Sequence, residues 1–468
     1  MTGKRKRKLA MPDTLIIVAS VVLLVAILSW IIPSGTYDYQ EMNINGRIRN
    51  VAIDGTYHTI DKSEVTTTGF LGFFSVLYRG CVEAADVIFM ILCCCGTFGV
   101  VVKTGAFHAG IGTILKKLKG KEILLVPIIM MIFGLGGSVF GMASEFYGFY
   151  PLIVGLGVAL EYDAMFGFAI IAVGEFVGFM GATLNPYSVG IAQTISGVEL
   201  YSGTGYRAIC FVIFMAISII YVMVYGRKIK KNPGASVVFG EKNIHAFDRD
   251  ELNEYSFTLK DGLVLLDVLV VLVVLMLGLI KWGWDFPQLC GLFLLMSMIA
   301  AAICKWSPNK WCSEFIDSAK TAMWGCILTG IAKAITVVMQ DAQIMDTVIY
   351  GLSNVLKNAP HAVSAQVMLV VQTLINFFIP SATGQASATM PIMAQLADII
   401  GVSRQTAVLA FQFGDGLSNI FWPTADIVII CGLGGISLQK WYKWFTPLFL
   451  ILFVTQAILL GIATGIGF

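Results

Sequence analysis

Charged residues are scarce in this chain of 468 residues, since Asp, Glu, Lys and Arg make up 13% of it and hydrophobic residues 57%. A soluble domain carries about a quarter charged residues, so this composition is not that of a protein that folds in water. The formal net charge of +2 gives no reason to expect a nucleic-acid partner. The partners it does predict are membrane lipids and a small-molecule substrate.

Metal-binding patterns are also lacking. The chain has 4 histidines, and its 10 cysteines lie mostly inside apolar stretches, as at 93–95, without the spacings of zinc or iron–sulfur sites. We therefore predict buried thiols, no cofactor and no metal beyond a coupling ion. The sequence offers no constellation of nucleophile, base and metal typical of an enzyme, and no repeated filter typical of a channel.

Long apolar runs are abundant. Runs of roughly 20 residues suffice to cross about 30 Å of hydrocarbon as helices, and the short alternating segments of a membrane β-barrel are not seen. The sequence predicts an all-α polytopic membrane protein. We expect about nine transmembrane helices and two re-entrant hairpins, in two inverted repeats that form scaffold and transport domains.

Basic clusters orient these spans, because cytoplasmic loops are rich in lysine and arginine. The basic run 4–8 precedes an apolar stretch at 12–33, which we interpret as a retained first helix in preference to a cleaved signal peptide. Residues 34–78 hold few basic groups and are expected outside, whereas the clusters at 116–121 and 227–231 are expected in the cytoplasm. This predicts a bacterial cytoplasmic (inner) membrane protein with a cytoplasmic N-terminus and an outer C-terminus.

The predicted organisation is a first repeat, a linker, a connecting span and a second repeat. Their ranges are 1–226 with a hairpin at about 122–160, a polar cytoplasmic linker at 227–260, a span within 261–285, and 286–468 with a hairpin at about 362–400. The other expected spans are 80–104, 164–195, 207–226, 286–305, 318–339, 404–432 and 442–466.

The repeat leaves a trace in the sequence. Pro151 and Pro391 open the second arms of the two hairpins, and 23 residues after each proline comes a glycine followed by an acid, Glu175 or Asp415. Further on, each long helix carries an asparagine near a proline. Such internal symmetry is typical of alternating-access carriers.

Prolines at 186 and 423 predict breaks in two membrane helices, because proline removes a backbone hydrogen bond. Broken backbone persists at membrane depth only where protein or a water-filled cavity meets it. Nearby hydroxyl, amide and carbonyl oxygens suit sodium, and half-helix N-termini after Ser144 and Gly384 suit a carboxylate. The alternative is that small residues there only allow close helix packing.

The polar residues near the two prolines and at the two hairpin tips form the candidate site. The predicted substrate-binding residues are Ser144, Glu145, Thr183, Asn185, Ser381, Thr383, Gly384, Gln385, Asn419 and Thr424. The predicted ion-coupling residues are Glu175, Asn185, Asp415, Ser418 and Asn419, and the predicted helix breaks are Pro186 and Pro423.

Three acids, Glu145, Glu175 and Asp415, are predicted near mid-membrane, where an ionisable side chain is a functional candidate. Structural pairing with Lys333 or with the backbone is the alternative. We expect Glu145 to bind substrate, because a hairpin tip can both touch the solute and move. We expect Asp415 to couple the ion.

Four stretches, Gly141–Glu145, Gly181–Gln193, Pro380–Ser387 and Phe413–Asn419, resemble the YfcC-like branch of the anaerobic C4-dicarboxylate carrier (DcuC) family. The resemblance covers nearly the whole chain. That family is related to arginine/ornithine antiporters and to AbgT-type transporters of the ion-transporter superfamily. The resemblance implies a homodimeric scaffold, a core of two hairpins and two broken helices, and cation-coupled or exchange transport through the residues named above.

The charges then favour a substrate class. A doubly anionic substrate needs basic partners, yet the predicted core holds three acids and one base, Lys333. We therefore predict a secondary active transporter of a small amino acid, by arginine/ornithine-type exchange or cation-coupled uptake with sodium or protons. The alternatives are a C4-dicarboxylate carrier and a transporter of peptides or other carboxylates.

Overall fold

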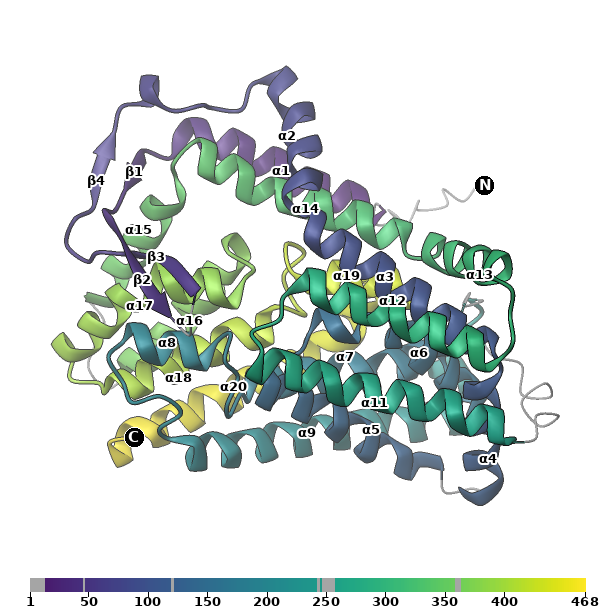
Figure 1. The fold of residues 1–468 in the computed structure, drawn as a ribbon. Helices are drawn as coiled ribbons and strands as arrows, with labels where there is room; N and C mark the ends of the chain where they lie inside the picture. Colours follow the sequence, from purple (N-terminus) through teal and green to yellow (C-terminus); the bar gives the residue numbers. More distant parts are fainter. Residues whose placement is uncertain (1–12, 45–46, 119–121, 242–244, 246–256, 358–362) are drawn as a thin grey trace, which may run out of the picture.

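The computed structural model describes residues 13–468 apart from 45–46, 119–121, 242–244, 246–256 and 358–362, and it is dominated by helices (Figure 1). Among these residues, seven helices are long and apolar enough to cross a membrane: α1 (Thr14–Ile31), α3 (Ala85–Lys103), α9 (Thr204–Lys231), α11 (Leu259–Lys281), α12 (Phe286–Ile303), α14 (Met323–Asp341) and α20 (Leu438–Ile466). The predicted all-α polytopic class is confirmed. The count of nine spans and the inverted repeat stay predictions.

The remaining α-helices are shorter. They are α2 (Phe70–Glu83), α4 (Ala106–Leu118), α5 (Leu125–Leu135), α6 (Phe149–Ala159), α7 (Ala164–Met180), α8 (Val189–Ile195), α13 (Pro308–Lys320), α15 (Met345–Lys357), α16 (Ser364–Phe378), α17 (Ala382–Ile399), α18 (Arg404–Ser418) and α19 (Asp426–Gly434). Helix α9 runs five residues into the segment predicted as linker, and residues 242–244 and 246–256 of that linker lie outside the described residues.

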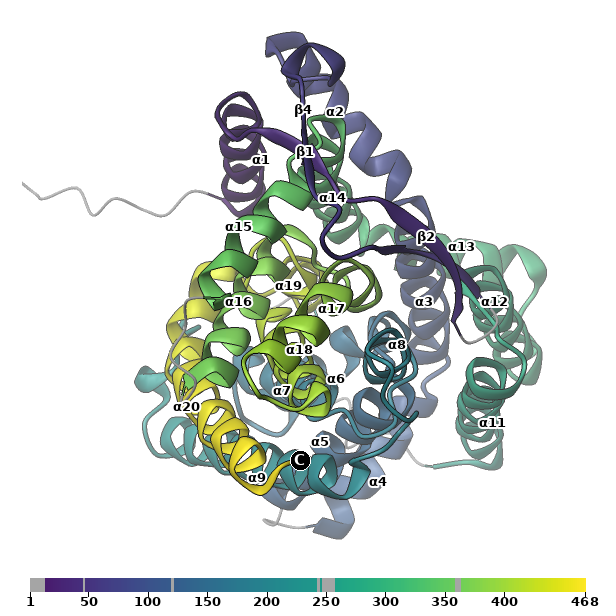
Figure 2. The ribbon, with the colours of Figure 1, turned by 90° about the vertical axis from the view of Figure 1, so that its left-hand side faces the viewer.

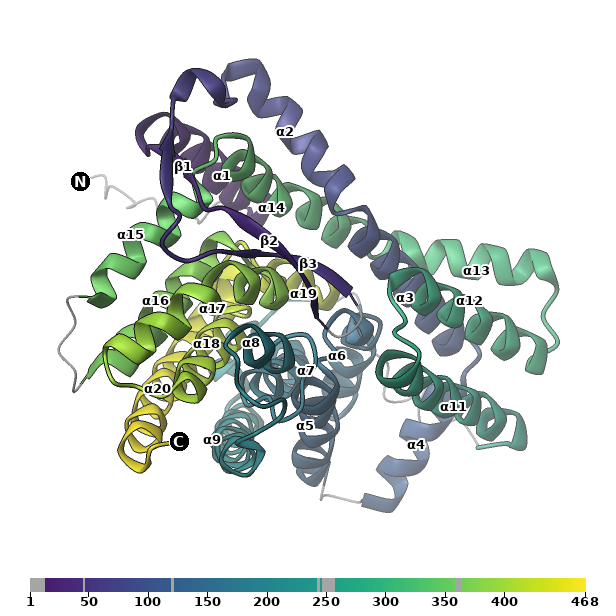
Figure 3. The ribbon, with the colours of Figure 1, turned by 60° about the vertical axis from the view of Figure 1, so that its left-hand side comes forward.

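Four short strands follow α1, and the sequence did not predict them. The strand β1 (Ser34–Thr36) pairs antiparallel with β4 (His58–Ile60), and β2 (Tyr39–Ile44) pairs with β3 (Arg47–Ala52). We call residues 34–60 the strap. It lies against α15 and α17, as Figure 3 shows.

Helix α2 corrects the predicted start of the second span, which was placed at about residue 80. The helix begins at Phe70 and continues into α3 with Ala84 between them, so residues 70–78 are helical and not part of a loop. Charged residues near its end dilute the apolar signal there. One of them, Arg79, donates to Asp341 of α14 at 2.9 Å.

Helices α2 and α14 cross at small residues and form part of an elongated arm. A Cβ at Gly80 would lie 2.3 Å from the carbonyl oxygen of Gly330, so the two backbones touch only because glycine is there. Helices α1, α2, α3, α11, α12, α13 and α14 form this arm, which we call the scaffold, along one side of the molecule (Figures 1 and 3).

Apart from α4, which packs on α11 and α3, the other helices form a compact core around α7 and α18, as the end-on view in Figure 2 shows. All 17 residues of α7 are buried. Each predicted hairpin consists of two α-helical arms joined by a tip, α5 and α6 in the first and α16 and α17 in the second. The first tip contains a π-helical turn at Gly136–Phe140 and a 3-10 turn at Ser144–Phe146. In both hairpins the arms pack mainly on the central helix of their own half, α7 or α18, and little on each other.

Both central helices end where the sequence placed a break. Helix α7 stops at Met180 and α8 starts at Val189, with Pro186 in the gap. Helix α18 stops at Ser418 and α19 starts at Asp426, with Pro423 in the gap. The stretches 164–195 and 404–432 are therefore each two helices, which leaves backbone groups at both gaps free of regular helical bonds.

Candidate substrate and ion site

The two breaks lie side by side in the core. A Cβ at Gly416 of α18 would lie 2.4 Å from the Cα of Met180, the last residue of α7. One turn earlier, Gln412 Nε2 donates to the carbonyl of Phe179 at 2.7 Å. Close contact at a glycine therefore brings the polar residues of both gaps into one region.

The first gap is held by side chains of the first hairpin. Ser138 Oγ donates to the carbonyl of Gly181 at 3.0 Å, and its own carbonyl accepts from the backbone N–H of Thr183 at 2.9 Å. Asn185 Oδ1 accepts from the backbone N–H groups of Tyr187 and Ser188, at 2.9 and 3.2 Å, so it fixes the turn that leads into α8. Thr183 and Asn185 are both buried, and their bonds fix the shape of the break.

The second gap is organised by Asn376, a buried residue of α16 that the sequence did not single out. Its Nδ2 donates to Asp415 Oδ1 at 2.8 Å, to Asn419 Oδ1 at 3.0 Å and to Gln385 Oε1 at 3.2 Å. Three predicted site residues thus meet at one amide. Gln385 also donates to Gln372 Oε1 at 2.7 Å, which extends the network along the hairpin.

Each hairpin also contacts the break of the other half. Tyr147, just past the first tip, donates its hydroxyl to Asp426 Oδ1 of α19 at 2.8 Å. Thr383, in the second tip, donates to the carbonyl of Tyr187 at 2.9 Å. These two bonds connect parts of the chain that lie 279 and 196 residues apart.

Several buried oxygens at this site have no hydrogen-bond partner. Glu175 uses Oε2 to accept from the hydroxyl of Tyr150 at 2.8 Å, and its Oε1 is left over. Asp415 Oδ2, Asn376 Oδ1 and Thr424 Oγ1 are also unpartnered. Buried acceptors normally find a partner, and these are all hard oxygen donors of the kind that bind sodium or a proton.

The other predicted residues differ in their surroundings. Glu145 is 7% exposed and accepts from the backbone N–H of Ala143 at 3.0 Å, which ties it to its own tip beside α3. Ser418 donates to the carbonyl of Gly414 at 2.5 Å within its own helix. At the second tip, Ser381 is exposed and its Oγ accepts from the N–H of Gly384 at 3.3 Å. Ser144 is partly exposed.

Basic side chains are not paired with the carboxylates of the site. Lys333 lies on α14, partly buried, and takes part in none of the ion pairs that the described residues form. Arg207 of α9 is 1% exposed, with Nε and Nη1 unpartnered, and lies near Gln405, ten residues before Asp415 along α18. At about 1.5 Å per residue this is about 15 Å from the break. The described residues also hold no cluster of His, Cys, Asp and Glu suited to a metal.

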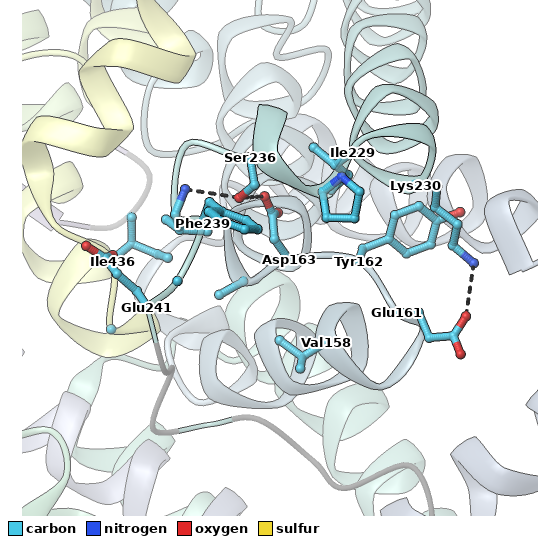
Figure 4. Close-up of a pocket in the computed structure, with 15 residues that line it drawn as sticks. Val158, Glu161, Tyr162, Asp163, Ile229, Lys230, Ser236, Phe239, Glu241 and Ile436 are labelled. Atoms are coloured by element: carbon cyan, nitrogen blue, oxygen red, sulfur yellow. Dashed lines mark hydrogen bonds and ion pairs between the residues drawn. The ribbon is translucent and has the colours of Figure 1, made fainter.

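A separate cavity of about 590 Å³ lies at the other end of α7 (Figure 4). Its wall includes Asp163, which accepts from Ser236 Oγ at 2.6 Å and from Tyr225 at 2.5 Å. Asp163 precedes Glu175 by twelve residues, or about 18 Å along the helix. This cavity is therefore distinct from the breaks. The bond from Ser236 to Asp163 in its wall holds the start of the linker.

A polytopic helical protein with polar breaks at the centre of its core is a membrane transporter. The chain belongs to the DcuC family, described as the C4-dicarboxylate anaerobic carrier, whose model matches residues 11–465. It is 32% identical to the Escherichia coli K12 protein named "Putative basic amino acid antiporter YfcC" over 100% of this chain and 99% of that one. It is 27% identical to an uncharacterized Haemophilus influenzae protein, over 99% of both. The relative whose name states a function is thus a transporter and not an enzyme.

Two solved structures are similar over nearly their full length. The YdaH transporter of Alcanivorax borkumensis matches with a TM-score of 0.45 and 14% identity, covering 98% of this chain and 99% of that one. MtrF of Neisseria gonorrhoeae, from a study of antimetabolite efflux pumps, matches with a TM-score of 0.44 and 16% identity, covering 97% and 96%.

Proposed function

We propose that this transporter is a secondary carrier of a basic amino acid in the cytoplasmic membrane, working by arginine/ornithine-type exchange or by cation-coupled uptake. The observation that carries the proposal is the charge of the core. Glu145, Glu175, Asp415 and Asp426 lie at the hairpin tip and the breaks, and none forms an ion pair within the part of the chain that the structure describes.

Carboxylates at membrane depth are expensive to bury, by at least about 2.5 kcal/mol for aspartate on insertion scales. Unless they are protonated, a cation must compensate them. A solute with a cationic side chain and a coupling sodium ion or proton together supply that compensation. The relative named as a basic amino acid antiporter supports the same class of substrate.

A C4-dicarboxylate is the second candidate, and the family description favours it. Its two negative charges would need cations that reach the breaks. Arg207 lies about 15 Å from Asp415 along α18, by the helical rise per residue, and Lys333 has no partner that ties it to the site. A dicarboxylate would therefore add charge to a region that already carries four acids.

Coupling to sodium or protons is proposed on the unpartnered oxygens of Glu175, Asp415 and Thr424. A homodimeric scaffold, the inverted repeats and the orientation of the termini are proposed on the resemblance and on the basic flanks. No cofactor is required for this mechanism.

Counterflow in proteoliposomes tests the substrate. Vesicles loaded with L-ornithine should accumulate labelled L-arginine, whereas vesicles loaded with succinate should not accumulate labelled fumarate. Saturation of the rate and its acceleration by internal solute distinguish a carrier from a channel. Exchange of fumarate for succinate without exchange of arginine would replace the proposal with the dicarboxylate alternative.

A further inference from the structure

The four core carboxylates, Glu145, Glu175, Asp415 and Asp426, differ in their exposed fractions. Glu145, Glu175 and Asp415 are 7%, 0% and 0% exposed. Asp426 is partly exposed, although it lies at the break between α18 and α19. Of the four acids, Asp426 therefore has the largest exposed fraction and is the most accessible to a solute.

The hydrogen-bond partners of these acids lie in different parts of the chain, and the partner of Asp426 comes from the other half. Glu145 accepts from its own hairpin tip, Glu175 from Tyr150 and Asp415 from Asn376. The partner of Asp426 is Tyr147, which is 2% exposed and donates to Oδ1 at 2.8 Å. No other side chain among the described residues bonds to Asp426, so Tyr147 is the side chain that orients this carboxylate.

Asp426 lies where three parts of the structure meet. It lies in the first turn of α19, where the helix dipole favours a negative side chain. Tyr147 belongs to the first hairpin, and α19 packs on α14 of the scaffold, where a Cβ at Gly432 would lie 3.1 Å from the Cα of Gly325. A cation bound here would contact hairpin, break and scaffold boundary together.

We propose that Asp426 is the carboxylate that binds the cationic side chain of the solute, and that Tyr147 is its positioning residue. This inference builds on the proposed basic amino-acid transport. It also replaces Glu145, whose carboxylate is occupied with its own tip, as the substrate-binding acid.

The test compares L-arginine with L-citrulline, in which a neutral urea group replaces the guanidinium. In arginine-loaded proteoliposomes, Asp426→Asn should weaken the apparent affinity for labelled L-arginine at least about tenfold, as expected for the loss of a charge-assisted bond. The concentration of citrulline that half-inhibits uptake of labelled L-arginine should change by less than about twofold. Asp426→Glu should keep the preference for arginine, and Glu145→Gln should not abolish it.

The matched control is Asp317→Asn, which makes the same chemical change at a half-exposed residue of α13 paired with Lys320. It should transport like the wild type. If Asp426→Asn fails to yield monodisperse protein, Tyr147→Phe serves instead, because it leaves the carboxylate and removes its orienting bond. It should lower the arginine-to-citrulline preference.

If folded Asp426→Asn, or Tyr147→Phe where that variant is used, keeps the wild-type preference for arginine over citrulline, the inference is overturned. Arginine exchange by the wild type would still support the proposed function. A wild type that exchanges no basic amino acid would overturn both.

Discussion

At the scale of single residues, the second break depends on one amide. Asn376 Nδ2 is shared by Asp415, Asn419 and Gln385, and hydrogen bonds to charged groups contribute about 1.5–3 kcal/mol each. Replacing Asn376 with leucine leaves three buried acceptors without their donor. We expect uptake to fall by about tenfold or more, since about 1.4 kcal/mol corresponds to a factor of ten.

The control for Asn376→Leu is Gln366→Leu on the same helix, where the amide donates to the carbonyl of Ala457 at 3.2 Å, away from the break. Initial rates across a range of sodium concentrations and pH values should change little in the control and lose their ion dependence in Asn376→Leu. Equal effects of the two substitutions would mean that Asn376 only supports the fold.

The second residue-scale prediction concerns Asn185 and Asn419. Alanine at either position should abolish uptake while expression and monodispersity are kept. At Asn185 the reason is that the N–H groups of Tyr187 and Ser188 lose their acceptor in the turn before α8, and an unsatisfied buried donor costs about 1–3 kcal/mol. Asn185→Asp, which keeps the accepting oxygen, should therefore retain more activity than Asn185→Ala. Normal apparent affinities for solute and ion in both alanine variants would refute the assignment.

Residues near the prolines could be predicted from the sequence, and their partners could not. A proline marks a break locally, which is why Asn185, Asn419 and Asp415 were identified. Asn376 and Asp426 carry no such local mark. Their importance comes from contacts such as the bond from Tyr147 to Asp426, which spans 279 residues and depends on how two halves of the chain pack.

At the scale of elements, three hydrogen bonds from the strap converge on one carboxylate of α15. Asp346 accepts from the backbone N–H of Tyr37 at 3.0 Å, from Thr36 Oγ1 at 3.1 Å and from the hydroxyl of Tyr39 at 2.7 Å. Asp346→Ala should release the strap, because three donors lose their acceptor at once. Hydrogen exchange of residues 34–60 should then accelerate, with exchange of α7 unchanged. Unchanged protection of the strap would contradict this anchoring.

The same contact should depend on pH. Burial and the nearby Asp346 both raise the pKa of Tyr39 above its usual value. A group whose pKa is raised in the folded state stabilises that state fully below its unfolded pKa, about 10 for tyrosine, and loses the contribution as pH rises further. Protection of the strap should therefore decline above pH about 10, and Tyr39→Phe should remove that dependence. A decline that persists in Tyr39→Phe would assign it to other groups.

Elements could be predicted from the sequence where a long apolar run or a proline marks them. The long apolar helices and the interruptions in both hairpins follow from composition and proline. The strands of the strap, the amphipathic helices α4, α13 and α15, and the start of α2 do not, because each mixes charged and apolar residues and becomes stable only against its neighbours. The packing of both hairpin arms on α7 and α18 is likewise a tertiary contact that no local pattern encodes.

At the scale of the whole molecule, the orientation in the membrane is the prediction that decides how the hairpins open. The basic flanks predict that the strap lies outside and the linker inside, so the first hairpin should face the cytoplasm and the second the exterior. Asn45 and Asn243, which fall at the centres of the two polar segments, lie outside the described residues. Thr59 and Lys231 are exposed residues of the same segments and serve as labelling positions.

Cysteines are introduced at these two positions in a background with Cys312→Ser, since Cys312 is the exposed native thiol among the cysteines of the described chain. In intact cells, an impermeant maleimide should label Thr59→Cys, and Lys231→Cys should react only after the membrane is permeabilised. The physical reason is the cost of moving a lysine-rich segment such as 227–231 across the bilayer, which keeps it on the side of synthesis. Labelling of Lys231→Cys in intact cells, with Thr59→Cys protected, would invert the orientation. It would then assign the first hairpin to the exterior gate, and the bond from Tyr147 to Asp426 would close the core against solute arriving from outside.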